Sequence, residues 1–128
     1  MTVEEIALAS RAVACRAWRW MPGMLTTDGF RICRVDADGY KFGYLTEYSY
    51  AHTVDGDVLP DLQDHATLGC LLALVREAHG KPAVPMFWGD YWQIVYTSEV
   101  DDGCAGHEHI GDGDTEIEAL VAALEAAP

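Results

Sequence analysis

Residues 64–80 read DHATLGCLLALVREAHG, and this stretch decides the fold class. Asp64 is a residue type that caps helix N-termini, and Gly80 is the type that closes helices in a left-handed conformation. Between them, apolar residues fall almost all round the helical circumference, which predicts a helix buried on most of its surface. Gly69 lies in its middle, where glycine costs about 1 kcal/mol relative to alanine. We therefore expect another element to approach this helix closely at Gly69.

The segments on both sides of the central helix carry the alternating apolar pattern of β-hairpins. Residues 30–46 read FRICRVDADGYKFGYLT, in which Asp-Gly separates two apolar runs. Residues 83–99 read AVPMFWGDYWQIVYTSE, in which the Gly-Asp pair predicts a two-residue type II′ turn. One face of the second strand in the first hairpin is expected to carry Tyr40, Phe42 and Tyr44.

Two further helices are predicted at the ends of the sequence. Thr2 and Glu5 form a capping box that starts a helix near residue 3, and Pro22-Gly23 is expected to end it. Its expected apolar face comprises Val3, Ile6, Ala7, Val13, Ala14, Ala17 and Trp18. The last helix is expected to open at Thr115 with Glu118 as its capping partner. Its expected buried residues are Ile117, Leu120, Val121 and Leu124.

These elements predict a single α+β domain over residues 1–128, in the order α-β-β-α-β-β-α, with an antiparallel sheet covered by helices. Residues 47–62 are expected to form a loop with, at most, one short extra strand, and residues 100–114 a polar, glycine-rich loop. Half of the 128 residues are hydrophobic, which suits a packed core. No apolar run approaches the roughly 20 residues needed to span a bilayer.

The residues favour a protein of the cytoplasm. The N-terminal stretch MTVEEIALAS carries acid where a secretory signal carries base. The four cysteines, at positions 15, 33, 70 and 104, are dispersed, so we expect four free thiols and no disulfide framework.

Charge is distributed unevenly along the chain. Residues 1–42 hold six Lys/Arg and five acids, whereas residues 43–128 hold two Lys/Arg and sixteen acids. The acidic part would repel phosphates, so nucleic acid is not expected as a direct partner, and neither is a membrane. A local anion site remains open in the N-terminal third.

The best candidate for such a site begins in CRAWRWMPGML, residues 15–25. On the predicted helix, Arg16 and Arg19 are surface neighbours. Arginine suits phosphate or carboxylate, and tryptophan stacks on bases. The candidate ligand-binding residues are Arg16, Trp18, Arg19, Trp20, Arg31 and Arg34. The alternative is that the tryptophans pack in the core while the arginines are solvated or pair with the acidic remainder.

A second candidate is a metal site at CAGHEH, residues 104–109. If the segment is extended, His107 and His109 point to the same side and Cys104 can join them, with Asp112 or Asp114 as a fourth ligand. The alternative is a solvated connection, since the spacing matches no structural zinc pattern. The chain carries no G-x-S-x-G, Walker or G-x-G-x-x-G motif, so no catalytic residue and no cofactor are expected.

Three stretches carry a resemblance. CRAWRWMPGM, LPDLQDHATLGCLLALVREAHG and TEIEALVAALEAAP, about half of the chain, resemble a group of small uncharacterised phage and prophage proteins. The resemblance implies a small accessory protein made by a phage in a bacterial cytoplasm. It implies no site residue.

The expected function is therefore that of a phage-encoded, non-catalytic binding protein, acting as a homo-oligomer. It is expected to antagonise a host defence factor by sequestering an anionic, nucleotide-like small molecule. One alternative is an acidic inhibitor that imitates nucleic acid and binds a host defence protein. Others are a metal-dependent hydrolase built on Cys104, His107 and His109, and a virion assembly factor.

Overall fold

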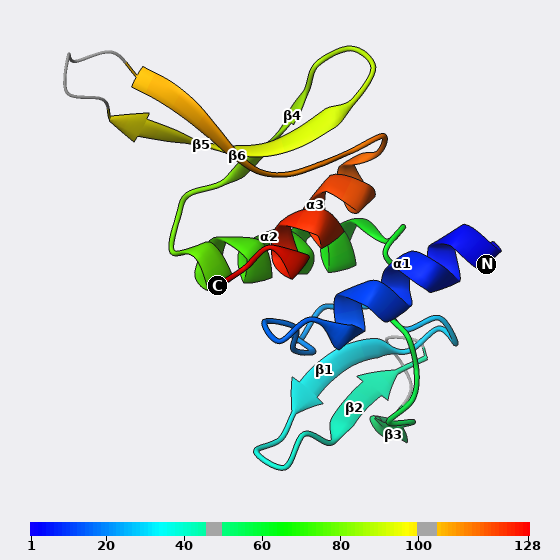
Figure 1. Ribbon diagram of the computed structural model, residues 1–128. Coiled ribbons are helices and arrows are strands. Elements are labelled where there is room, and N and C mark those ends of the chain that lie inside the picture. Colours follow the sequence, from blue (N-terminus) through cyan, green and yellow to red (C-terminus); the bar gives the residue numbers. More distant parts are fainter. Residues whose placement is uncertain (46–49, 100–104) are drawn as a thin grey trace.

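The computed structural model describes residues 1–45, 50–99 and 105–128 of the chain. In these ranges the chain forms three helices and six strands (Figure 1). In chain order they are α1 (Val3–Ala14), β1 (Arg31–Val35), β2 (Lys41–Tyr44), β3 (His52–Val54), α2 (His65–His79), β4 (Val84–Phe87), β5 (Trp92–Glu99), β6 (Ala105–Gly113) and α3 (Glu116–Glu125).

The strands form two antiparallel sheets, in the orders β1-β2-β3 and β4-β5-β6. The α+β architecture predicted from the sequence is confirmed, with two sheets in place of one. In Figure 1 the three helices lie between the two sheets, with α3 directly against the sheet of β4, β5 and β6. The core joins residues from all three helices to both sheets. Its fully buried large side chains include Met24, Ile32, Leu71, Leu74, Ile94, Leu120 and Leu124.

Helix α2 forms as its sequence predicts. The Asp64 carboxylate accepts a hydrogen bond from the backbone N–H of Thr67 at 3.0 Å, and Gly80 closes the helix with φ +63°. The expected close approach at Gly69 is wrong, because no atom lies within 4 Å of the position that a Cβ would take there. A close approach of this kind is found instead at Gly111 in β6. A Cβ on Gly111 would lie 2.5 Å from both the carbonyl oxygen of Ala119 and the amide nitrogen of Ala123 in α3.

Helix α1 starts at its predicted capping box but ends seven residues early, at Ala14. Its buried residues are Ala9 and Ala12, whereas Val3 and Ile6, on the predicted apolar face, are exposed. Trp18 and Trp20 are two positions apart, which places them on opposite sides of a helix but on one side of an extended chain. Because the chain leaves the helix, both rings pack against the core.

Residues 105–113, predicted as part of a polar loop, form strand β6. This strand pairs with β5 along its whole length, and the glycines at 111 and 113 let α3 pack directly on it. The short extra strand allowed for residues 47–62 is present as β3. In β2 the inward positions are Lys41 and Gly43, so the aromatic residues on the other face are only partly covered or exposed.

Candidate functional site

The tryptophan-rich segment between α1 and β1 lies against the hydrophobic core. The rings of Trp18 and Trp20 meet edge to face, with centroids 5.6 Å apart and an interplanar angle of 83°. Both rings are partly buried and pack against the core. Each tryptophan therefore has a packing role, and each also lines a surface hollow.

This hollow, called the indole hollow below, has a volume of about 590 Å³. Ligand pockets in proteins commonly measure roughly 300–1,000 Å³. Its lining residues are Trp18, Arg19, Trp20, Met21, Pro22, Val35 and Gly39. A second hollow of about 330 Å³ adjoins it, because Trp18 and Arg19 also line that one, together with Arg16 and Glu77.

Arg19 is the cation of the indole hollow, and it is held by Glu77 of α2. Its two terminal nitrogens donate to the two carboxylate oxygens at 2.8 and 2.7 Å. These hydrogen bonds raise the pKa of the Arg19 guanidinium and lower the pKa of the Glu77 carboxyl. Both side chains are more than half exposed, so the pair contributes little to stability and can be exchanged for another partner.

The other predicted arginines occupy different surroundings. Arg31 donates to Asp64 at 2.5 and 3.1 Å and to the carbonyl of Gly23 at 3.0 Å, which ties β1 to the start of α2. The Arg34 guanidinium lies over the Phe42 ring, 4.2 Å from its centroid. Arg16 is exposed, and it has no hydrogen-bond or ion-pair partner within residues 1–45, 50–99 and 105–128. The premise that Arg16 and Arg19 are helix neighbours is wrong, because α1 ends before them.

Lys41 is a site residue that the sequence pattern did not single out. Its side chain is buried, with 4% of the residue exposed, and its ammonium lies 5.1 Å from the centroid of the Trp20 ring. Burial lowers the pKa of this ammonium, against the opposing effect of Asp55 and Asp57. The only feature of the sequence that marks Lys41 is that a lysine occupies an inward-facing position of a short strand. The Lys41 ammonium makes a cation–π contact with the Trp20 ring, although Lys41 does not itself line the hollow.

Trp18 has one unusual feature. Its indole nitrogen Nε1 is buried and donates to no acceptor in the part of the chain that the structure describes. Unpaired buried donors are rare in folded proteins and cost about 1–3 kcal/mol each. The Trp18 side chain is therefore held in a position where its indole N–H has no hydrogen-bond acceptor among the described residues.

The metal candidate receives no support from the described residues. His107 and His109 lie on strand β6 opposite Thr97 and Val95, so they share one face, and both are exposed. Cys104 lies outside the described residues. Within the described ranges, no three His, Cys, Asp or Glu side chains come together in a way that could hold a metal ion. Three of the four cysteines, Cys15, Cys33 and Cys70, are described, and all three are free.

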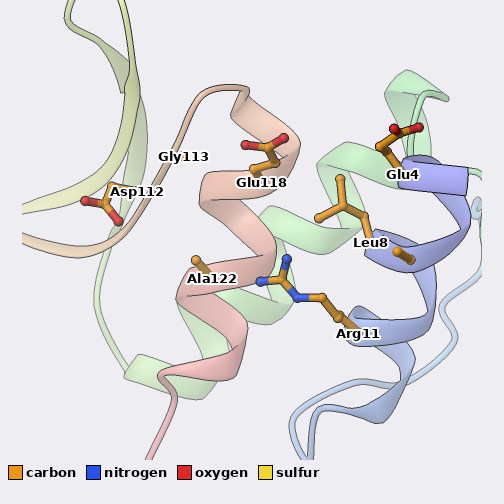
Figure 2. Close-up of a pocket in the computed structure, with 8 residues that line it drawn as sticks. Glu4, Leu8, Arg11, Asp112, Gly113, Glu118 and Ala122 are labelled. Carbon is orange, nitrogen blue, oxygen red and sulfur yellow. The ribbon is translucent and has the colours of Figure 1, made fainter.

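A further groove of about 330 Å³ lies between α1, α3 and the end of β6 (Figure 2). Its lining includes the carboxylates of Glu4 and Glu118 and one cation, Arg11, while the side chain of Asp112, at its edge, points away from Arg11 in Figure 2. In Figure 2 Arg11 extends from α1 toward α3. There it donates to Glu125 at 3.2 and 2.5 Å. Arg11 is thus paired as Arg19 is, but the carboxylates of Glu4 and Glu118 beside it disfavour an anionic ligand in this groove.

A scan of family models and searches of curated proteins and of solved structures find no match to this chain. None of the described helices is both long and apolar enough to cross a bilayer.

Proposed function

We propose that the protein is a non-catalytic binding protein that holds a planar, anionic, nucleotide-like small molecule in the indole hollow. The observation that carries this proposal is the combination of two tryptophan rings and one exchangeable arginine around a hollow of about 590 Å³. The rings supply stacking surface, and the guanidinium supplies a planar fork for a phosphate or carboxylate.

The ligand-binding set narrows from the six predicted residues to four. Trp18, Arg19 and Trp20 line the indole hollow, and Arg16 lines the adjoining one. Arg16 lacks a carboxylate partner among the described residues, so its charge is free for a second anionic group. Arg31 and Arg34 have structural contacts of their own, with Asp64 and with the Phe42 ring.

Binding requires Arg19 to exchange Glu77 for the ligand anion. This exchange costs little, because an exposed ion pair contributes little to stability. In the free protein, the ion pair with Glu77 balances the charge of Arg19 beside the apolar hollow. In a phage-infected bacterium, to which the sequence resemblance points, such binding would sequester a nucleotide signal of a host defence.

The proposal predicts opposite effects for the two members of the Arg19–Glu77 pair. Arg19→Gln removes the cation, and we expect nucleotide affinity to fall at least ten-fold. Glu77→Gln frees the cation, and we expect affinity to rise about three-fold or more. The measurement is a thermal-shift screen with ADP-ribose, cyclic ADP-ribose and cyclic dinucleotides, followed by calorimetry on those that raise the melting temperature.

Tyr40→Ala serves as the matched control. This exposed aromatic residue lies on the β1–β2 hairpin, which contributes Val35 and Gly39 to the indole hollow, but Tyr40 itself does not line it. Its affinity is expected to equal that of the unmodified protein. Absence of any shift across the nucleotides, or equal loss of affinity in Arg19→Gln and Glu77→Gln, would argue against the proposed function.

A further inference from the structure

The sheet of β4, β5 and β6 has one covered and one uncovered face. A Cβ on Gly111 or Gly113 would collide with α3, so this face of β6 lies against the helix. In the same register, Pro85 pairs with Ile94 and Ile94 with Gly111, so these residues share the helix face. Residues one position along β4 and β5 point to the opposite face, as does Asp112 of β6, and no other described helix or strand packs extensively against that face.

The uncovered face is apolar along β4 and at the turn that joins β4 to β5. Val84 and Met86 lie on that face, in register with Val95 and Gln93 of β5. At the tip, where β4 and β5 join, Phe87, Trp88 and Tyr91 remain 54%, 49% and 40% exposed. Trp88 and Tyr91, two large aromatic residues exposed together at the uncovered face of a small domain, indicate an interaction surface. Phe87 pairs with Trp92, and Trp92 with Gly113, so Phe87 lies on the face that α3 covers. We call Val84, Met86, Trp88 and Tyr91 the hairpin surface.

The charge around the hairpin surface selects its partner. Residues 82–128 contain ten acids and neither lysine nor arginine. Asp90 lies in the turn between Trp88 and Tyr91, and Asp112 lies across from Gln93 on the uncovered face. The last cation of the chain, Lys81, lies over the Tyr96 ring, toward the other end of β5. A second copy of this chain, a nucleic acid or an anionic membrane would meet like charge here.

The shape of the sheet selects the form of the partner. Helix α3 covers the other face of the same three strands, and a helix laid across the uncovered face would complete an equivalent layer. Strand addition at the β4 edge is disfavoured, because Pro85 has no N–H to donate to a neighbouring strand. We propose that the hairpin surface binds a cationic amphipathic helix of a partner protein, with its apolar stripe on Trp88 and its basic residues toward Asp90 and Asp112.

The probe is a fluorescently labelled, 18-residue amphipathic helix of leucine and lysine, with a leucine and glutamate peptide of the same pattern as its counterpart. Fluorescence anisotropy with the full chain measures both affinities at two salt concentrations. We expect the lysine peptide to bind at least ten-fold more tightly than the glutamate peptide, and its affinity to fall as salt rises.

Variants locate the binding on the molecule. Trp88→Ala is expected to weaken the lysine peptide about ten-fold, and Asp90→Asn with Asp112→Asn about five-fold. Trp88→Phe keeps an aromatic side chain and is expected to bind within three-fold of the unmodified protein. Tyr40→Ala and Tyr50→Ala, exposed aromatic residues elsewhere on the chain, are expected to leave the affinity unchanged.

Three results would overturn the proposal. One is equal affinity for the lysine and glutamate peptides. Another is unchanged affinity in both Trp88→Ala and the double aspartate variant. The third is an equal loss in the tyrosine variants, which would assign the binding to diffuse surface charge. Nucleotide binding at the indole hollow is independent of all three results.

Discussion

At the scale of single residues, the Asp64 carboxylate joins two elements by accepting hydrogen bonds from Arg31 of β1 and Thr67 of α2. The bonds from Thr67 come from its N–H and hydroxyl, so Asp64 both caps α2 and fixes β1 beside it. The hydrogen bond from Arg31 is the main reason that the pKa of Asp64 falls to about 2. The Thr67 hydroxyl also accepts a bond from the N–H of Leu25 at 2.8 Å, which extends the same network to the chain before β1.

This lowered pKa predicts a defined pH dependence of stability. A carboxyl whose pKa is lower in the folded than in the unfolded state stabilises the fold above the unfolded value, near 4. That contribution, about 1–2 kcal/mol here, is lost as the pH falls through 2. Urea unfolding at a series of pH values between 5 and 2 measures it.

Asp64→Asn is the matched variant, since asparagine also caps helices but carries no charge for Arg31. We expect it to be less stable than the unmodified protein at pH 7 and to show a flatter pH profile below pH 4. An unchanged profile in this variant would mean that other carboxylates cause the acid sensitivity.

Two glycines of the chain are expected to respond to alanine in opposite directions. Gly111→Ala places a methyl group against the backbone of α3, and we expect a loss of about 3 kcal/mol or more in unfolding free energy. Gly69→Ala, in the open middle of α2, is expected to gain about 0.5–1 kcal/mol. Thermal and urea unfolding of both variants measure the difference. Similar effects of the two substitutions would contradict the close packing of β6 on α3.

At the scale of elements, local signals in the sequence predict where the helices start. They do not predict element boundaries that depend on tertiary packing. The caps at Thr2, Asp64 and Thr115 are where the sequence predicts them, because capping depends on residues within one turn. The end of α1 is different. The helix stops at Ala14 because two tryptophans at i, i+2 spacing both reach the core, which no helical pattern signals.

Strand β6 shows the same limit. The segment AGHEHIGDG has no apolar alternation, and its glycines indicate a loop when they are considered alone. They serve instead to admit α3, a requirement that exists only in the folded molecule. The same holds for the site: composition predicted Trp18, Arg19 and Trp20, but the pairing of Arg19 with Glu77 and of Arg31 with Asp64 depends on where α2 lies.

The orientation of α1 gives a prediction at this scale. The structure buries Ala12 and exposes Ile6, which is the reverse of the face expected from hydrophobicity. Ile6→Gln is expected to change the unfolding free energy by less than about 1 kcal/mol, whereas Ala12→Gln is expected to cost about 3 kcal/mol. Chemical unfolding of the two variants checks this orientation, and a larger loss for Ile6→Gln would reverse it.

At the scale of the whole molecule, two regions of different chemistry are separated. The indole hollow lies in the N-terminal part, which holds six of the eight lysines and arginines. The hairpin surface lies in the part beyond residue 81, which holds none. We propose an anionic small molecule as the ligand of the first region and a cationic protein segment as the partner of the second. The homo-oligomer expected from the sequence remains a prediction, and the acidic hairpin surface is not its expected interface.

The four tryptophans divide evenly between these regions, with Trp18 and Trp20 at the hollow and Trp88 and Trp92 on the hairpin. The most direct test of the proposed function is therefore a ¹⁵N–¹H spectrum of the four indole groups during titration with ADP-ribose and cyclic dinucleotides. We predict that at least one of these nucleotides shifts the Trp18 and Trp20 signals while those of Trp88 and Trp92 stay in place. Signals of Trp18 and Trp20 that remain fixed with every nucleotide would contradict the account.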